Sequence, residues 1–382
     1  MPIDQQLLGQ KLRRYRTQFD RSLEEVADGT GIIPAQLEAY EAGNMAPTGD
    51  EILIFADYYK CDYKFFISNE KLAPFEETET LFRRYGSEFS REDRGTVQEF
   101  LFLSECEDFL QKQLGKETPR TFVFKRPLGS SATWGEEAAA QLRRFQDYPS
   151  IGVPLDIYKD FRSIGLHVFR RRLRNSNISG LYVRHPVAGK CVLVNYDEDV
   201  YRQRFTAAHE VCHAILDSSA DFVVSLQSEK SQEREIRANK FASHYLAPSS
   251  FLQSIPDPRN WDTEKAKVWA NRMNVSTEML AYALYRERLI SRRIVDIIKS
   301  ERVPKQLKID PEIPNTLSQR SRVRKRELLA RGLSDYYVKL CFESYREGGI
   351  SASRMAEMLL LESDSDLRSL AIMYGEQLEY AN

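Results

Sequence analysis

The feature that most constrains this chain of 382 residues is the run His209-Glu-Val-Cys-His213. On a helix, residues four apart lie on one face, so the two imidazoles can converge on a single metal ion. Glu210 is turned too far from that face to be a ligand, but it is close enough to take a proton from water at the metal. The run therefore predicts a helix that carries a catalytic zinc site, with Glu210 as the base.

A catalytic zinc needs a third protein ligand and one open position. The next predicted helix, from about residue 232 to 246, offers Glu233 and Glu235. These two residues point about 200° apart on a helix, so only one can face the metal. Asn239 shares the face of Glu235 and can support a ligand by a hydrogen bond, whereas Glu233 shares its side with Lys240, as on a solvated face. We therefore expect Glu235 as the third ligand and Asn239 beside it.

The sequence around these helices predicts an α+β domain. Apolar spacing indicates helices and strands in alternation, namely helices at 136–145, 155–164 and 199–216, and strands at 166–173, 180–184 and 190–195. We expect residues 190–195 to form an edge strand, which could hold an extended substrate by strand addition.

Residues 1–70 predict five short helices. Ser22 with Glu25, and Thr48 with Glu51, have the spacing of capping boxes at two helix starts. Pro34 suits the first turn of the third helix. The close succession of the second and third helices is typical of a helix-turn-helix.

The helix-turn-helix segment is acidic. Residues 1–70 contain seven lysines and arginines against twelve aspartates and glutamates, and the presumed recognition helix 34–41 has no basic residue. Because neutralised phosphates supply most nonspecific DNA affinity, we expect this segment alone to bind DNA weakly. Its candidate DNA contacts are Gln36, Arg14 and Arg16. A protein-interaction or purely structural role is the alternative.

Two parts of the chain resemble known families. The residues Leu23-Glu-Glu-Val-Ala27, Gly31-Ile32, Tyr40-Glu-Ala-Gly43 and Pro47 resemble the XRE, or phage-repressor-like, helix-turn-helix family. The run from Arg204 to His213, followed by Glu235-Ile-Arg-Ala-Asn-Lys-Phe-Ala242 and Leu246-Ala-Pro248, resembles the ImmA/IrrE metallopeptidases. Cys212 and Tyr245 stand where that family commonly has glycine and leucine, and these departures bear on substrate range.

The second resemblance implies a minimal gluzincin-like fold with a small sheet. It implies zinc held by His209, His213 and Glu235, with Glu210 as the base. It further implies cleavage of a partner repressor, which relieves transcriptional repression under stress or in mobile elements. Tyr182 and His185 are weaker candidates to polarise the scissile carbonyl, with a surface role as the alternative for His185.

The other regions carry less information. Residues 71–133 are expected to form a helical connector, and residues 301–382 a basic linker followed by a helical region. The basic run 320–326 favours a solvated helix face over a nucleic-acid contact. The net charge of −1, five scattered cysteines, and the lack of a secretory signal or a long apolar run predict a cytoplasmic protein without a membrane partner.

The sequence thus predicts a multidomain, mainly α protein with an α+β core. Its expected parts are a helix-turn-helix at 1–70, a connector at 71–133, a zinc peptidase domain at 134–300 and the region 301–382. The expected function is a zinc-dependent endopeptidase that cleaves a repressor and binds DNA or a partner protein through residues 1–70. A dimer is compatible with this organisation. The alternative is a non-proteolytic transcription regulator, or an antitoxin-like module, that uses the zincin fold as a sensor.

Overall fold

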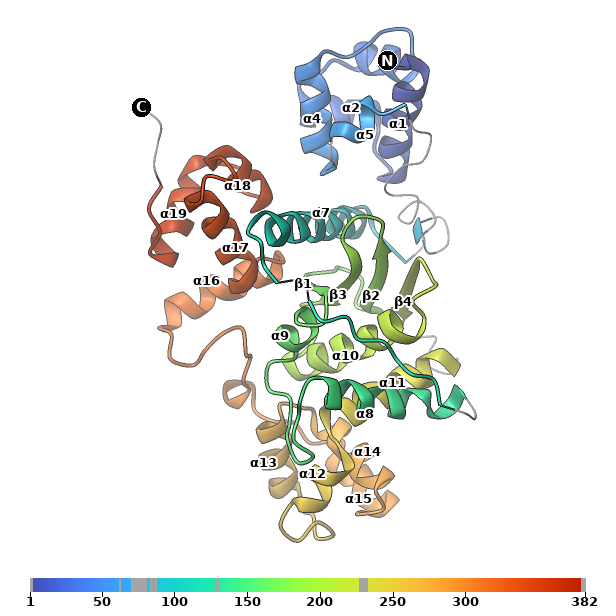
Figure 1. Ribbon diagram of the computed structural model, residues 1–382, viewed down its shortest axis with the longest axis vertical. Coiled ribbons are helices and arrows are strands. Elements are labelled where there is room, and N and C mark those ends of the chain that lie inside the picture. The colour runs from blue at the N-terminus through green and yellow to red at the C-terminus, as the bar shows by residue number, and fades with distance from the viewer. Residues whose placement is uncertain are drawn as a thin grey trace. The chain divides into compact units, whose positions relative to one another are not determined.

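The structure, a computed structural model, describes residues 3–61, 63–69, 81–82, 85, 88–117, 119–127, 131–226 and 233–378 (Figure 1). The chain divides into two compact units. One contains Met1–Lys116, His185–Ala188 and Tyr336–Asn382, and the other contains Glu117–Arg184 and Gly189–Asp335. No helix in the described ranges is both long enough and apolar enough to cross a membrane.

The first unit is helical. Its N-terminal part has the five predicted helices, α1 (Gln5–Gln18), α2 (Leu23–Thr30), α3 (Pro34–Glu41), α4 (Gly49–Tyr59) and α5 (Tyr63–Ile67). Both predicted capping boxes are confirmed, at the starts of α2 and α4. Gly31 ends α2 with φ of 74°, a left-handed conformation that glycine adopts without strain, and this turn connects α2 to α3.

Tyr15 is at the centre of the small N-terminal core. Its ring centroid lies 5.2 Å from that of Tyr59, 5.4 Å from Phe65 and 5.7 Å from Phe66. Aromatic pairs at these separations stabilise a small core beyond the burial of their area. The packing of α1 on α4 and α5 thus supports the helix-turn-helix pair.

Further along the chain, the described residues of this unit form α7 (Arg91–Gln113), α17 (Asp335–Arg346), α18 (Ala352–Met358) and α19 (Asp364–Tyr374). The end of α7 bonds to α17, because Ser344 Oγ donates to Gln113 Oε1 at 2.6 Å and Gln111 Nε2 donates to the Tyr336 hydroxyl at 3.0 Å. These two hydrogen bonds join the connector helix α7 to the first of the C-terminal helices.

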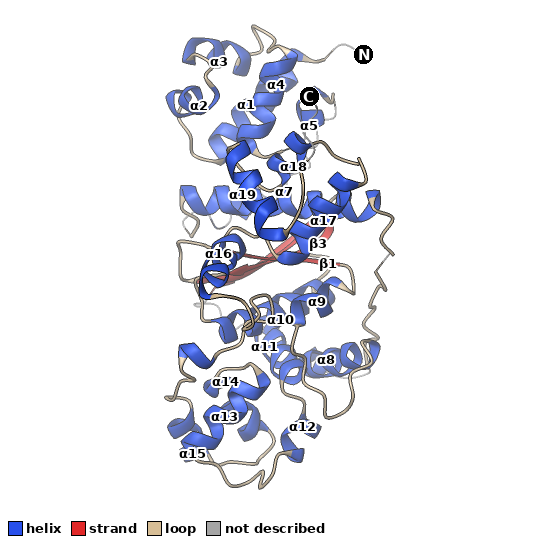
Figure 2. Cartoon of the chain, turned by 90° about the vertical axis from the view of Figure 1, so that its left-hand side faces the viewer, coloured by secondary structure: helices blue, strands red, loops and turns tan. Residues whose placement is uncertain are grey.

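The second unit contains the sheet. Its elements in chain order are η1 (Ser131–Thr133), α8 (Trp134–Phe145), α9 (Ile157–Arg162), β1 (Leu166–Arg171), β2 (Ile178–His185), β3 (Gly189–Asn195), α10 (Val200–Leu216), β4 (Phe222–Leu226), α11 (Glu233–Leu246), α12 (Ser249–Ser254), α13 (Thr263–Met273), α14 (Thr277–Arg286), α15 (Arg292–Ile298), η3 (Lys305–Leu307) and α16 (Gln319–Ala330). Helices α9 and α10 lie on one face of the sheet (Figure 2).

The strand order corrects one expectation. The four strands run β1-β3-β2-β4, with β1 parallel to β3 and β2 antiparallel to β4. Residues 190–195 therefore form an interior strand, and the prediction of an edge strand there was wrong. The reason is that β1 pairs with β3 rather than with β2, and β4, which the sequence analysis missed, adds outside β2. The edge strands are β1 and β4.

Arg204 fixes the helix that carries the histidines. Its side chain is fully buried, and its guanidinium donates to the carbonyl oxygens of Pro154 at 2.5 Å, Leu155 at 2.6 Å and Asn274 at 2.9 Å. A buried charge is tolerated only when its donors are satisfied, as they are here by backbone oxygens. Arg204 thus ties α10 both to the segment before α9 and to the loop between α13 and α14.

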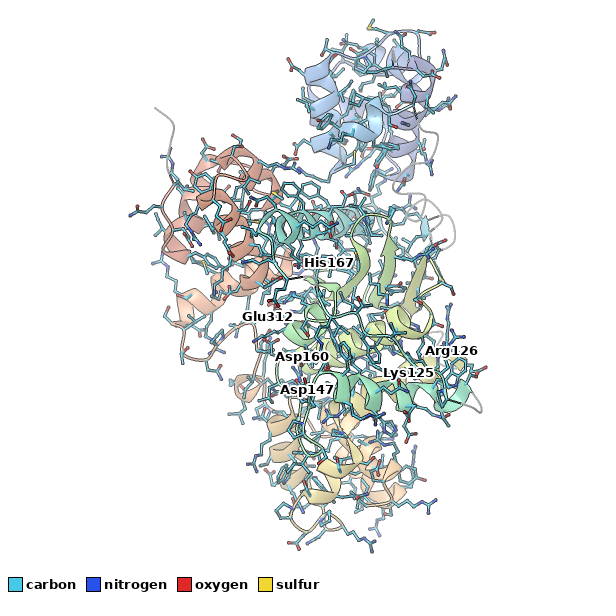
Figure 3. The ribbon with its side chains drawn as sticks, in the orientation of Figure 1. Lys125, Arg126, Asp147, Asp160, His167 and Glu312 are labelled. Atoms are coloured by element: carbon cyan, nitrogen blue, oxygen red, sulfur yellow. The ribbon has the colours of Figure 1, made fainter. Side chains whose placement is uncertain are left out.

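A buried ionic cluster holds residues 305–313, which fall in the region predicted as a basic linker, against this unit. Arg170 on β1, 1% exposed, binds Asp310 with both guanidinium nitrogens, at 2.8 and 3.0 Å, and contacts Glu312 at 2.7 Å. Arg162 contacts Glu312, labelled in Figure 3, at 3.1 Å. The compact unit therefore extends past residue 300.

We predict that Asp310→Ala lowers the free energy of unfolding by about 3 kcal/mol, because it removes a partner of a buried charge. The matched control is Asp197→Ala, which breaks an ion pair with Arg172 whose side chains are 63% and 50% exposed; its expected cost is below about 1 kcal/mol. Chemical denaturation of both variants measures the difference. Equal losses would contradict a special role for the buried cluster.

Candidate metal centre

The site is built by two packed helices, α10 and α11. Asp199 caps the N-terminus of α10 by accepting from the Tyr201 amide, and the helix then runs without a break to Leu216. Alanines with no exposed surface, among them Ala208, Ala238 and Ala242, lie on these helices and leave room for close packing. His209 and His213 lie on α10, and Glu235 lies in the first turn of α11.

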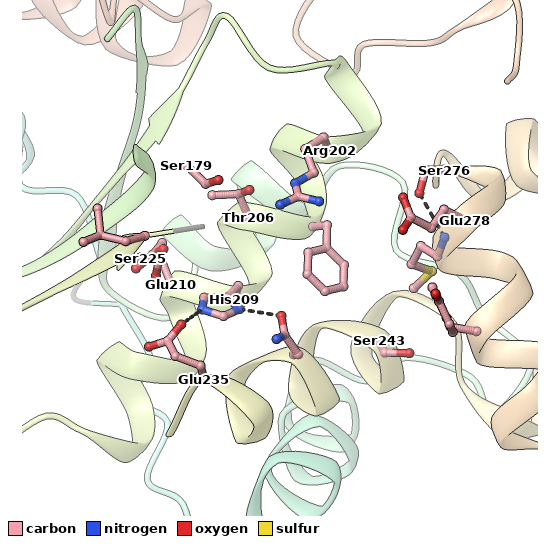
Figure 4. A pocket seen from close by; sticks show the side chains of 15 residues that line it. Ser179, Arg202, Thr206, His209, Glu210, Ser225, Glu235, Ser243, Ser276 and Glu278 are labelled. Carbon is pink, nitrogen blue, oxygen red and sulfur yellow. Dashed lines mark hydrogen bonds and ion pairs between the residues drawn. The ribbon is translucent and has the colours of Figure 1, made fainter. Parts of the chain in front are cut away.

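The side chains of these three residues converge, and Figure 4 shows His209 beside Glu235. His209 Nε2 lies 3.0 Å from Glu235 Oε2, His213 Nε2 lies 3.4 Å from Glu235 Oε1, and the two Nε2 atoms are 3.2 Å apart. All three side chains are buried, with exposed fractions of 7% or less. Two imidazole nitrogens and a carboxylate in one small volume form the donor set of a catalytic zinc site.

The outer nitrogens of both imidazoles have partners. His209 Nδ1 lies 3.0 Å from Asn239 Oδ1, and His213 Nδ1 lies 2.8 Å from Asp217 Oδ2. Arg237 in turn donates to Asp217 Oδ1 at 2.5 Å. Such contacts fix the ring orientation and leave Nε2 free to bind a metal. The sequence analysis placed Asn239 near the site but missed Asp217, whose signal is its position four residues after His213 at the end of the same helix.

The charges within the cluster favour an ionised Glu235. Burial raises the pKa of Glu235, but its contacts with His209 and His213 outweigh burial and hold the pKa well below its usual range. Burial lowers the pKa of His209. Burial also opposes a charge on His213, yet its contacts with Asp217 and Glu235 raise the pKa to about 9. Glu235 is thus a carboxylate, as a metal ligand must be.

Glu210 is fully buried and faces the same cavity (Figure 4). No hydrogen bond of normal geometry reaches its carboxylate oxygens among the described residues, although the Ser225 hydroxyl lies close enough to favour the charged form. Burial raises the pKa of Glu210 to about 8, although the nearby His213 opposes the shift. An unpaired buried carboxylate is costly unless a bound group satisfies it. A metal at the three-residue cluster, with water beside it, fits these oxygens and the donor set.

The cavity has a volume of about 380 Å³. One end contains His209, Glu210 and Glu235, and the other is bounded by α14. The other residues that line the cavity lie on β2, β4, α10, α11 and α14, or directly before α14. They are Ser179, Arg202, Phe205, Thr206, Ser225, Leu226, Asn239, Ser243, Ser276, Glu278, Met279 and Tyr282. The site thus opens into a space that is large enough for part of a peptide.

The other predicted site residues lie elsewhere. Tyr182 is a fully buried core residue and does not line the cavity. His185 lies five residues beyond Gly180 on β2, roughly 16 Å along the strand, and its Nδ1 accepts from the Val187 and Ala188 amides. The structure therefore brings neither residue to the cavity, contrary to the expectation that they polarise a substrate carbonyl. Cys212 is fully buried, as expected for a packing residue.

Two of the three candidate DNA-contacting residues, Arg16 and Gln36, form hydrogen bonds within the first unit. Arg16 binds Glu41 through two nitrogens, at 2.6 and 2.8 Å, and donates to the Arg21 carbonyl. Gln36 donates to the Tyr40 hydroxyl at 2.6 Å. Arg14 is half-buried. Arg16 therefore stabilises the contact between α1 and α3, and its charge is already neutralised.

Strand β2 passes unusually close to Glu210 at Gly180. A Cβ atom built on Gly180 would lie 2.7 Å from both Glu210 Oε1 and Thr206 Cγ2. The β2–β4 register shifts between Ile178 and Gly180, so the strand is irregular at this point. Ser179 Oγ and Thr206 Oγ1 both donate to Glu198, at 2.8 and 2.9 Å, and this carboxylate ties β2 to α10. Only glycine fits here without displacing Glu210.

We predict that Gly180→Ala lowers the free energy of unfolding by about 1–3 kcal/mol, as expected for an overpacked core position. Gly95→Ala is the control, because nothing lies within 4 Å of a Cβ at that helical position. That change should be neutral or slightly stabilising. Denaturation curves of the two variants provide the measurement, and an unperturbed Gly180→Ala would show that β2 can move away from Glu210.

The site and fold define a metallopeptidase-like domain: a helix with two histidines and a glutamate, a second helix with a further glutamate, and a small sheet beside them. A family model described as the IrrE N-terminal-like domain, a peptidase family, matches residues 161–285. A helix-turn-helix family model matches residues 12–66. The comparison with curated proteins found no match. The chain therefore contains an IrrE N-terminal-like domain and an N-terminal helix-turn-helix domain, and the resemblance stated from the sequence is confirmed.

Proposed function

We propose that this protein is a zinc-dependent endopeptidase that cleaves a partner transcription regulator. The observation that carries the proposal is the buried cluster of His209, His213 and Glu235, with the unpaired carboxylate of Glu210 facing the same cavity. A purely structural zinc site would be closed by four protein ligands, whereas this cluster has three and adjoins an open space.

In this proposal His209, His213 and Glu235 hold the zinc ion. When bound, zinc would supply Lewis-acid chemistry toward water and the scissile carbonyl. Glu210 accepts a proton from the attacking water and returns it to the leaving amine. Asn239 and Asp217 keep the two imidazoles oriented.

The substrate is proposed to bind as an extended strand along β4. This strand lies at the edge of the sheet, and its residues Ser225 and Leu226 line the cavity. Backbone hydrogen bonds to an edge strand bind a peptide irrespective of its sequence. Phe205, whose ring centroid lies 6.5 Å from that of His209, and Met279 and Tyr282 on α14 add apolar surface that suits a large apolar substrate side chain. Strand β4 thus takes the role that the sequence analysis gave to residues 190–195.

The helix-turn-helix makes DNA the expected partner of the first unit, and the peptidase domain makes a protein the expected substrate. A repressor that shares the DNA site would bring both partners together. We therefore propose a repressor as the substrate.

Metal content separates the two glutamates. We predict that Glu235→Ala loses zinc, because the cluster then has two ligands. Glu233→Ala should keep zinc, because this residue is exposed and bonds to Ser131. Asn239→Ala should weaken zinc binding by about 10- to 100-fold, the usual effect of removing a partner of a ligand. Elemental analysis and competition with a chelator measure this series. A zinc-free Glu233→Ala beside a zinc-loaded Glu235→Ala would reverse the assignment.

The Glu210→Gln variant tests proteolysis itself. The amide keeps the shape of the side chain but cannot accept a proton, so cleavage of a co-encoded repressor should fall by about 10²-fold or more while zinc remains bound. Cleavage by the wild-type protein should stop when a chelator is added and return with zinc. If the regulated genes respond normally in cells that carry Glu210→Gln, the protein acts without proteolysis, as a sensor.

A further inference from the structure

A basic surface around α16 (Gln319–Ala330) has no role in the metal site. Residues 320–331 contain six arginines and lysines and one acidic residue, Glu327. Leu329 is the only buried residue of α16. Most of this helix is therefore available to a partner.

The positive charges of α16 repel one another and destabilise the isolated helix. Arg320 and Arg324 are four residues apart, as are Arg322 and Arg326, and like charges at this spacing repel. A solvated helix usually alternates the signs of its charges, which gives attraction at the same spacing. The repulsion on α16 is relieved when an anion binds.

Two acidic groups near α16 are already paired with other cations. Asp335 binds Lys325 of α16, and Asp197 binds Arg172 at 2.8 Å. Arg320, Arg324 and Arg326 are exposed, and no ion pair of theirs occurs in the part of the chain that the structure describes. Their positive charge is therefore not cancelled from within the unit.

The basic surface extends beyond the helix. The Arg172 amide donates to the Ala330 carbonyl at 3.0 Å, which joins the end of β1 to the end of α16. Arginines from two segments thus share one surface.

We infer that this surface, defined by Arg320, Arg324 and Arg326, binds the phosphate backbone of double-stranded DNA. Arginine is the side chain best suited to phosphate, since its planar fork donates two parallel hydrogen bonds. The helix-turn-helix segment is acidic and its Arg16 is paired with Glu41, so phosphate neutralisation has to come from elsewhere in the chain. The inference does not depend on proteolysis or on the metal.

The test uses the full-length protein and a fluorescent DNA duplex of random sequence, with binding followed by anisotropy over a range of salt concentrations. The test variant carries Arg320→Gln, Arg324→Gln and Arg326→Gln. The control variant carries Arg259→Gln, Arg293→Gln and Lys305→Gln, which removes the same charge from exposed positions elsewhere in the second unit. Thermal unfolding checks that both variants remain folded.

The test variant should bind at least about tenfold more weakly than the wild type, with the slope of log affinity against log salt reduced by about 2 to 3, as expected for three lost phosphate contacts. The control variant should change less than about twofold. Equal losses in the two variants would overturn the inference, since they would report net charge alone. A second experiment compares two competitors, polyglutamate and unlabelled duplex, at equal concentrations of negative charge. If polyglutamate displaces the labelled duplex as strongly as unlabelled duplex does, the inference is overturned in favour of an acidic protein partner.

Discussion

The candidate metal centre depends on one packing constraint, the close approach of α11 to α10. Helix α11 is held on its other side by α8, so closely that a Cβ on Gly135 would lie 2.1 Å from the Arg237 carbonyl oxygen. Arg237 donates to Asp217, which contacts His213. The contact between α8 and α11 is thereby linked, through Arg237 and Asp217, to the orientation of the candidate ligand His213. Displacing α11 would move Glu235 and Asn239 together, because they lie one turn apart.

The second unit buries several charged side chains, and hydrogen bonds or ion pairs offset the free-energy cost of burying most of them. Arg204 is satisfied by three backbone carbonyls, and Arg170 by two carboxylates. Glu210 differs, since neither of its oxygens is bonded among the described residues. Among the buried carboxylates in the described ranges, Glu210 is the one with both oxygens lacking a hydrogen bond, which points to a bound group at the cavity. This contrast supports a chemical role for Glu210 more strongly than its position in a sequence motif does.

The sequence predicted what depends on local spacing. The five N-terminal helices, both capping boxes, and the face shared by Glu235 and Asn239 follow from helical periodicity and short-range capping. The sequence analysis missed what depends on contacts between distant segments. It could not place β3 inside the sheet, because the β1–β3 pairing is set by packing and not by either strand alone. Strand β4 was missed because five residues give too short a pattern, although Val223 and Val224 favour a strand. Asp217 was within reach of the helical spacing that identified His213.

The two proposals together divide DNA binding between two elements. In α1, Arg16 is bound to Glu41 on α3, so the helix-turn-helix uses a cation for its own stability. Helix α16 does the opposite, because it keeps like charges together at a cost to its own stability. A domain with few phosphate contacts discriminates by base edges and shape, while nonspecific affinity follows the number of neutralised phosphates. If α16 supplies the nonspecific affinity, sequence preference and overall affinity become separable properties of this chain. Changes in α3 would then alter which site is bound, and changes in α16 would alter how tightly any site is bound.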